Sequence, residues 1–166
     1  PSPAGLSGGA GVAVNSEIAI FPFPSGDVIA AFPQGGLRRW STVVTGARPG
    51  SAAANISDIA GDPVIDGNRV YIGNFSGLVA ALDISNGDRI WTAREGTVGP
   101  VWPAGGSVFL VNDVNELIRL DDSDGSVIWR VSLPDEIEGS WGRITGRYAH
   151  YGPIIAGGRL IVASSD

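Results

Sequence analysis

The sequence predicts an all-β fold, a section of a β-propeller built from four-stranded blades. Two observations lead to this prediction. Glycine accounts for 25 and proline for 11 of the 166 residues, while 43% of the chain is hydrophobic. Such a composition is typical of many short strands joined by tight turns, because glycine supplies positive φ angles and proline starts turns. The second observation is a repeat of about 40 residues, the size of one propeller blade.

The first half of the repeat is a strand, a glycine-containing turn and a second strand. Residues 63–72 (PVIDGNRVYI) and 153–162 (PIIAGGRLIV) align without a gap at an offset of 90. Residues 104–110 (AGGSVFL) repeat the turn and the second strand at an offset of 38 from the first copy. Apolar runs on both sides of a glycine turn predict a β-hairpin.

The second half of the repeat ends on a tryptophan, at Trp40, Trp91 or Trp129. In each copy a Gly or Asn lies 14 residues before the tryptophan and leads into an apolar run, which is followed by a glycine turn. Asn-Gly and Asp-Gly in two of these turns predict two-residue hairpins. A four-stranded sheet cannot bury both of its faces alone, so we expect neighbouring blades to stack on it. The tryptophans are expected to close the gaps between blades.

We expect one partial propeller domain over residues 1–166, with about three to four blades. The blades are predicted at about residues 1–45, 60–95, 98–133 and 150–166, the last of them incomplete. Closed propellers usually have four to eight blades. The chain is therefore expected to be a fragment of a longer protein.

Charge and composition argue against several functional classes. The formal net charge is −6, whereas a nucleic-acid-binding domain would carry a basic stripe that neutralises phosphates. The chain has no cysteine, which excludes disulfides, thiolate metal sites and a cysteine nucleophile within it. Its apolar runs are too short to span a bilayer as a helix. We expect no nucleic-acid partner.

Two features could indicate a calcium site or a catalytic base, but the residues around them do not support either one. Residues 121–125 (DDSDG) lack the spacing of a calcium-binding EF-hand loop, and alignment with the other copies predicts a hairpin turn there. His150 is the only histidine. A general base needs a nucleophile and an orienting group nearby, so we expect a structural role for it. We predict neither a metal site nor a catalytic residue.

Two connections are longer than the repeat requires. The next blade begins 23 residues after Trp40 and 24 after Trp129, but only nine after Trp91. Residues 41–62 and 130–152 therefore each contain about 14 extra residues. Long loops on a rigid scaffold are where binding residues usually lie. We expect a partner to bind at these two connections.

Several segments resemble known propeller families. The PQQ-type propeller repeat is matched by residues 70–73 (VYIG), 77–83 (GLVAALD) and 86–91 (NGDRIW). Within that superfamily, the chain resembles the BamB-type lipoproteins of the bacterial outer-membrane β-barrel assembly machinery, in particular alphaproteobacterial members. This second resemblance rests on residues 23–26 (FPSG), 57–65 (SDIAGDPVI) and 152–162 (GPIIAGGRLIV), and it covers nearly the whole chain.

The resemblance implies a non-enzymatic scaffold without a cofactor or small-molecule substrate, which has eight PQQ-like blades when complete. Such a protein lies in the periplasm, attached by a lipid anchor to the inner leaflet of the outer membrane. Its inter-blade loops dock onto the POTRA domains of a BamA-type core assembly protein. The residues expected to bind this partner are Arg48, Ile56, Ser57, Asp58 and Trp141.

Two of these residues have alternative interpretations. Asp58 matches the family's acidic contact position, but it is also a suitable turn residue whose carboxylate would accept backbone hydrogen bonds. Ala60 stands where the family has a second acidic residue, which weakens the expected contact. Trp141 is either an interface anchor or a lid over the edges of the blades.

Two other functions stay open. A PQQ-dependent dehydrogenase would hold a quinone and calcium at the propeller centre with Asp, Glu and Asn ligands, often beside a vicinal cysteine pair. This chain has no cysteine and no cluster of metal-binding carboxylates in its sequence. A propeller that binds a carbohydrate or a peptide is the third possibility, because enzymes and adaptors share the fold.

Overall fold

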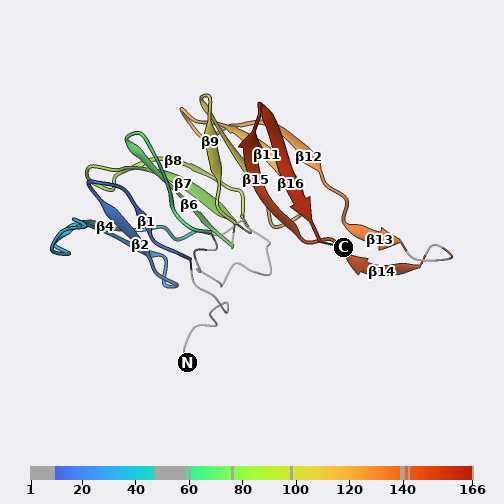
Figure 1. Cartoon of the computed structure of the whole chain (residues 1–166), viewed down its shortest axis with the longest axis horizontal. Helices are drawn as coiled ribbons and strands as arrows, with labels where there is room; N and C mark the ends of the chain where they lie inside the picture. The colour runs from blue at the N-terminus through green and yellow to red at the C-terminus, as the bar shows by residue number, and fades with distance from the viewer. Residues whose placement is uncertain are drawn as a thin grey trace.

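The structure, a computed structural model, describes residues 10–46, 59, 61–75, 77–97, 99–138, 141 and 143–165. The described chain forms three four-stranded antiparallel sheets and two β-hairpins (Figure 1). Within these residues, no helix has the length and apolar character needed to cross a membrane. The predicted all-β architecture of four-stranded blades is confirmed.

Each four-stranded sheet is a meander in which strands adjacent in sequence are paired. The first sheet contains β1 (Ala13–Val14), β2 (Ala19–Pro22), β3 (Asp27–Ala31) and β4 (Arg38–Val43). The second contains β5 (Val64–Asp66), β6 (Arg69–Asn74), β7 (Leu78–Asp83) and β8 (Arg89–Ala93). The third contains β9 (Trp102–Ala104), β10 (Ser107–Val111), β11 (Glu116–Asp121) and β12 (Val127–Ser132). The hairpins are β13 (Glu136–Glu138) with β14 (Ile144–Arg147), and β15 (His150–Ala156) with β16 (Arg159–Ser164).

The sheets stack face to face, and this stacking explains the long apolar runs of β6 and β7. Successive side chains of a strand point to opposite faces of its sheet. Val70 and Ile72 accordingly lie in a core shared with the first sheet, whereas Tyr71 lies in a core shared with the third. The same alternation places Ala80 in the first core and Ala81 in the second. The second sheet is thus buried on both faces.

The innermost strands of successive blades lie next to one another. Contacts join β1 to β5, β5 to β9 and β9 to β15, so the four strands follow a common inner wall. Figure 1 shows the sheets fanning outward from this wall in chain order, with β15 and β16 beside the third sheet. This is the arrangement of consecutive propeller blades.

Two of the repeated tryptophans contact the next blade along the chain. The Trp40 indole N–H donates a hydrogen bond of 2.8 Å to the carbonyl of Ile84, and Trp91 donates one of 2.7 Å to the carbonyl of Asp122. Each acceptor lies in the turn between the third and fourth strands of that blade. Trp129 is only half-buried and packs 6.1 Å from Phe109 of its own blade, measured between ring centroids.

Glycine is required where these indoles meet the turns. Gly87 and Gly125 have φ angles of +78° and +75°. A Cβ atom would lie 2.5 Å from Cε3 of Trp40 at Gly87, and 2.5 Å from Cε3 of Trp91 at Gly125. Any other residue would therefore be strained in its backbone and would collide with an indole ring.

The structure corrects two details of the sequence interpretation. The Asn-Gly and Asp-Gly turns were predicted as two-residue hairpins, but β7 ends at Asp83 and β8 begins only at Arg89. The longer turn forms because the Asp83 carboxylate accepts a 2.7 Å hydrogen bond from the Ser85 backbone N–H, and the N–H of Gly87 bonds back to the Asp83 carbonyl. The connection predicted as a loop over residues 130–152 contains the β13–β14 hairpin, and β15 of the fourth blade begins at His150.

Candidate partner-docking face

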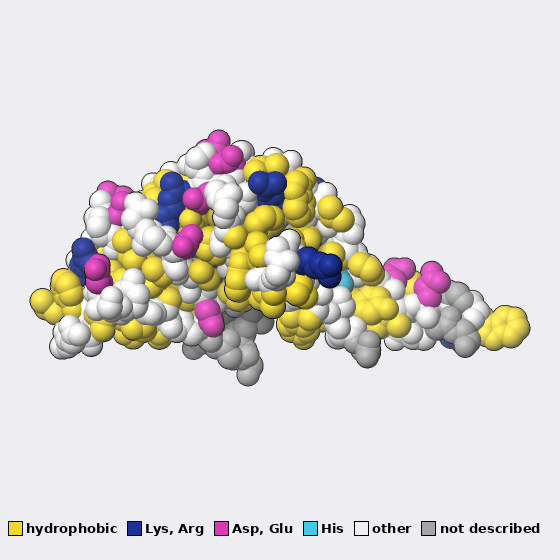
Figure 2. Space-filling view, turned by 45° about the horizontal axis from the view of Figure 1, so that its top comes forward, with side chains coloured by type: hydrophobic (Ala, Val, Ile, Leu, Met, Phe, Trp, Pro, Cys, Tyr) yellow, Lys and Arg dark blue, Asp and Glu magenta, His cyan; other side chains and the backbone are white. Residues whose placement is uncertain are grey.

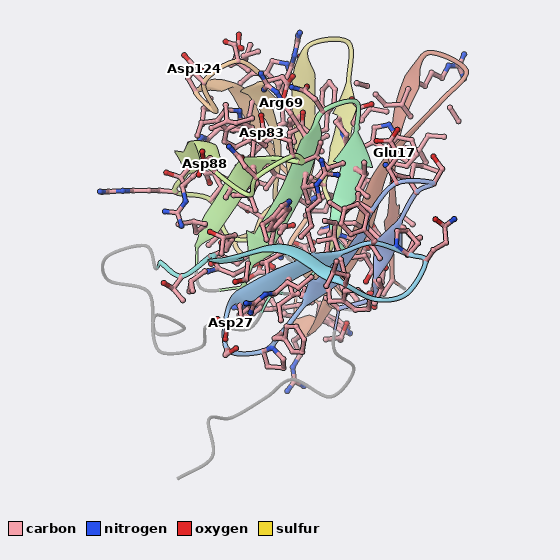
Figure 3. All side chains as sticks on the ribbon, turned by 90° about the vertical axis from the view of Figure 1, so that its left-hand side faces the viewer. Glu17, Asp27, Arg69, Asp83, Asp88 and Asp124 are labelled. Carbon is pink, nitrogen blue, oxygen red and sulfur yellow. The ribbon has the colours of Figure 1, made fainter. Side chains whose placement is uncertain are left out.

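The two long connections leave their sheets at the same end. In a meander the strand connections alternate between the two ends of the sheet, so the second-to-third turn and the exit of the fourth strand share one end. We call this end the loop face and define it by residues 23–26, 44–46, 94–97, 112–115, 133–138, 141 and 143–149. In Figure 3, Asp27, which follows the second-to-third turn of the first blade, lies at one end of the sheets. Asp83, Asp88 and Asp124, which lie in or beside third-to-fourth turns, are at the other end.

Backbone and side-chain hydrogen bonds hold the loop face together. The exit of the first blade is fixed by a 2.8 Å bond from the Val44 N–H to the Gly26 carbonyl. Asn74 is fully buried, and its side-chain amide donates a 3.0 Å bond to the carbonyl of Gly46. The side-chain oxygen of Asn74, Oδ1, accepts a 2.8 Å bond from the N–H of Leu78. Asn74 therefore ties the exit of one blade to the turn of the next.

A charged cluster on the loop face joins the second and third blades. Arg130 donates to Glu95 at 3.0 Å and to Glu116 at 3.2 Å. Asn112, which is fully buried, donates to Glu116 at 2.8 Å. The Glu95 side chain is 8% exposed, so its charge needs this guanidinium partner. Sequence reasoning missed the cluster because Glu95 and Arg130 are brought together only by the stacking of two blades.

A second polar cluster lies toward the opposite end of the same two blades. The Tyr71 hydroxyl donates a 2.6 Å bond to the Asp122 carboxylate, which also pairs with Arg69 at 3.0 Å. Burial raises the pKa of Tyr71 above its ordinary value, and the hydrogen bond to Asp122 raises it further. The phenol stays neutral and acts as a structural hydrogen-bond donor.

The segment 121–125 forms a turn, as its alignment with the other copies predicted, and its first carboxylate organises that turn. Asp121 accepts a 2.8 Å bond from the backbone N–H of Ser123, and the Gly125 N–H donates to the Asp121 carbonyl at 2.9 Å. The Ser123 hydroxyl and backbone hydrogen bonds lower the pKa of Asp121, as those of Ser85 lower the pKa of Asp83. The two turns have matching geometry in successive blades.

Four of the residues predicted to bind a partner lie outside the described residues. They are Arg48, Ile56, Ser57 and Asp58. Trp141 is described, and its side chain is 98% exposed at the end of the β13–β14 hairpin. Such exposure contradicts the alternative of a lid, because a lid would be buried against the blades it covers. In Figure 2 this part of the chain projects from the stacked sheets and ends in a hydrophobic side chain.

His150 fixes the base of the projecting hairpin. Its ring is 4% exposed and contacts the Ser164 hydroxyl at 2.8 Å and the carbonyl of Pro134 at 2.7 Å. The bond to a carbonyl requires a proton on Nε2, so the ring links the start of the hairpin to β16. The structure therefore gives His150 a positioning contact between the hairpin and the fourth blade.

The inner wall contains an apolar groove. It has a volume of about 340 Å³ and is lined by β5, β9 and β15 with the residues that precede them. Its lining includes Trp102, Pro103, Pro153 and Ile154, with Asp66 as the single carboxylate among the lining residues. This surface does not gather the several oxygen ligands that calcium requires.

Comparison with known proteins identifies the family. The family model described as outer membrane protein assembly factor BamB matches residues 1–131 and 111–166. The assembly factor BamB of Kangiella koreensis is 25% identical over 124 residues, which cover 75% of this chain and 32% of that protein. BamB of Pseudomonas aeruginosa is 25% identical over 116 residues, covering 70% of this chain and 30% of the relative. The chain thus spans about one third of the length of these relatives.

Solved structures show the same fold. BamB from Moraxella catarrhalis has a TM-score of 0.61 at 23% identity, covering 75% of this chain and 35% of that chain. A europium-containing methanol dehydrogenase has a TM-score of 0.63 at 15% identity, covering 78% of this chain and 26% of that chain. At these identities the likeness concerns the propeller fold alone. The sequence match over the entire length is decisive, and this chain belongs to the family of the outer membrane protein assembly factor BamB.

Proposed function

We propose that the protein to which this chain belongs is a non-enzymatic scaffold subunit of the machinery that assembles outer-membrane proteins. In this proposal the loop face docks onto the periplasmic POTRA domains of a BamA-type core assembly protein. The protein would lie in the periplasm and be held at the inner leaflet of the outer membrane by a lipid anchor.

One observation carries the docking proposal. At the loop face, a hairpin projects beyond the blades and presents Trp141, whose side chain is 98% exposed. Tryptophan is among the residues most enriched at the energetic centres of protein interfaces. The predicted contact residue Asp58 belongs to the other long connection, which leaves its blade at this same end. Both long connections would then contribute to one docking surface.

Charge reversal at Asp58 in the full-length protein tests this proposal. The Asp58→Lys variant should lose co-purification with the core assembly protein from solubilised envelopes. The matched control is Asp124→Lys, which makes the same change at the opposite end of the sheets (Figure 3) and should retain the partner. Retention of the partner by Asp58→Lys would remove Asp58 from the docking surface. Loss of the partner in both variants would contradict docking by the loop face.

The alternative is the propeller of a PQQ-dependent dehydrogenase. The inner-wall groove is lined mainly by apolar side chains and one carboxylate, Asp66, which favours the scaffold. Dye reduction by the full-length protein, with added quinone, calcium and an alcohol or sugar, distinguishes the two functions. The scaffold proposal predicts no turnover, and robust turnover would overturn it.

A further inference from the structure

The β13–β14 hairpin has the properties of a preformed docking arm. Its two strands share only three residue pairs, and no described strand pairs with the outer edge of either one. A two-stranded ribbon of this size is marginal in water unless something else supports it. The hairpin therefore leaves two free strand edges beyond the blades, where a further strand could add.

The base of the hairpin is fixed by both flanking blades. From the third blade, Asn115 donates a 2.6 Å side-chain bond to Asp135, and its carbonyl accepts a 2.8 Å bond from the Leu133 N–H. From the fourth blade, His150 contacts the carbonyl of Pro134 at 2.7 Å. The 3.0 Å bond from the Tyr148 N–H to the Asp135 carbonyl closes the base. An arm held this way loses little orientational freedom on binding, which favours affinity.

Two described residues near the end of the arm, Trp141 and Ile144, are exposed and apolar. Trp141 has a φ of +70°, a left-handed conformation that bulky residues rarely adopt. Ile144 adds an exposed aliphatic side chain at the start of β14, with 57% of its surface accessible. Trp141 and Ile144 are thus two exposed apolar side chains close in sequence to the start of β14.

The two strands of the arm carry opposite charges. Glu136 and Glu138 lie on β13, whereas Arg147 lies on β14 and Arg143 directly precedes it, and all four are exposed. A strand that pairs with the β14 edge would therefore lie next to basic side chains. Acidic side chains on that added strand would complement this charge. A lipid surface fits poorly, because hydrocarbon cannot satisfy the backbone N–H and C=O groups of an open strand edge.

We propose that β14 is a strand-addition site for a partner protein. The occupant is an edge strand flanked by acidic side chains, which pairs with Ile144–Arg147 while an apolar pocket beside it receives Trp141. Backbone hydrogen bonds supply affinity in this mode, and side-chain pockets supply specificity. The proposal rests on the proposed function, since it takes the partner to be the core assembly protein.

The test measures binding of the full-length protein to the purified periplasmic domains of the core assembly protein by biolayer interferometry. Trp141→Ala should weaken the affinity about 30-fold, the size of an interface hot spot. The double variant Arg143→Glu/Arg147→Glu should slow association about 10-fold at low salt, with a smaller effect in high salt. The matched double variant Glu136→Lys/Glu138→Lys, on the opposite strand, should bind at least as tightly as the wild type.

Several outcomes would overturn the inference. If Trp141→Ala and the arginine variant both bind with wild-type affinity, the arm does not take part in binding. The proposed function would still stand in that case if Asp58→Lys abolished binding. Equal losses in the arginine and glutamate variants would refute strand addition at β14. No binding by the wild-type protein would refute both proposals. Trp141-dependent binding to phosphatidylethanolamine–phosphatidylglycerol vesicles, without binding to the protein domains, would assign the arm to a lipid surface and overturn the inference.

Discussion

Replacement of Trp91 by alanine tests how the blades are held together. The Trp91 side chain is 6% exposed, lies against Gly125 of the next blade and packs 6.1 Å from the Tyr71 ring. Truncation of a buried tryptophan to alanine costs about 3–5 kcal/mol. The lost hydrogen bond to Asp122 is included in that range and is worth about 0.5–1.5 kcal/mol. We expect Trp91→Ala to lower the free energy of unfolding by about 4 kcal/mol.

Two further variants show how much of this loss comes from packing of Trp91, how much from its hydrogen bond, and how much follows from removing any tryptophan. Trp91→Phe keeps a ring in the gap but loses the indole N–H, so a smaller loss is expected. Trp141→Ala removes a tryptophan that is 98% exposed, and its effect should stay within about 0.5 kcal/mol. Urea unfolding of the full-length protein, followed by circular dichroism, gives the three values. If Trp91→Ala and Trp141→Ala differ by less than 1 kcal/mol, the inter-blade role of Trp91 is refuted.

Three further predictions concern the turns and the charged cluster. Gly125→Ala should destabilise the protein by about 2 kcal/mol or more, because the added Cβ would collide with Trp91. The control Gly105→Ala, at a φ of +56° with open space around it, should cost only about 1 kcal/mol. Equal urea midpoints for the two variants would refute the contact with Trp91. The pKa values of Asp83 and Asp121 are lowered in the folded state, so both carboxylates stabilise the fold at pH values above their unfolded pKa of 3.8, and this stabilisation is lost as the pH falls through the folded pKa values. The Asp83→Asn/Asp121→Asn variant should therefore lose less stability on acidification than the wild type. Parallel curves of stability against pH for the two proteins would contradict this. Arg130→Met should cost about 1–2 kcal/mol because Glu95 loses its guanidinium partner; an unchanged urea midpoint would show that the pair contributes nothing.

The repeat predicted the blades because strand periodicity and turn residues are local properties. The short apolar runs within residues 63–72 and the glycine-containing turn between them specify strands whatever lies beside them. The length of the turn after Asp83 was misjudged because its hydrogen bonds to Ser85 and Gly87 outweigh the preference of Asn-Gly for a two-residue hairpin. A dipeptide signal does not include such competing side-chain bonds.

The docking arm could be located from the sequence but its form could not be predicted. The extra length after Trp129 marked a special connection, yet its strands have only Glu136–Glu138 and Ile144–Arg147 to pair. These runs are too short and too polar to show a strand pattern. The contact between His150 and Pro134 also escaped prediction, because it depends on how the connection folds back onto the fourth blade.

Site-specific photo-crosslinking tests the central claim most directly. A benzophenone amino acid placed at Trp141 of the full-length protein would report which molecule touches the projecting arm in the intact cell envelope. The same amino acid at Asp124, at the opposite end of the sheets, serves as the control (Figure 3). Docking by the loop face predicts a crosslink to the core assembly protein from position 141 and none from position 124. A crosslink from position 124 without one from position 141 would contradict it.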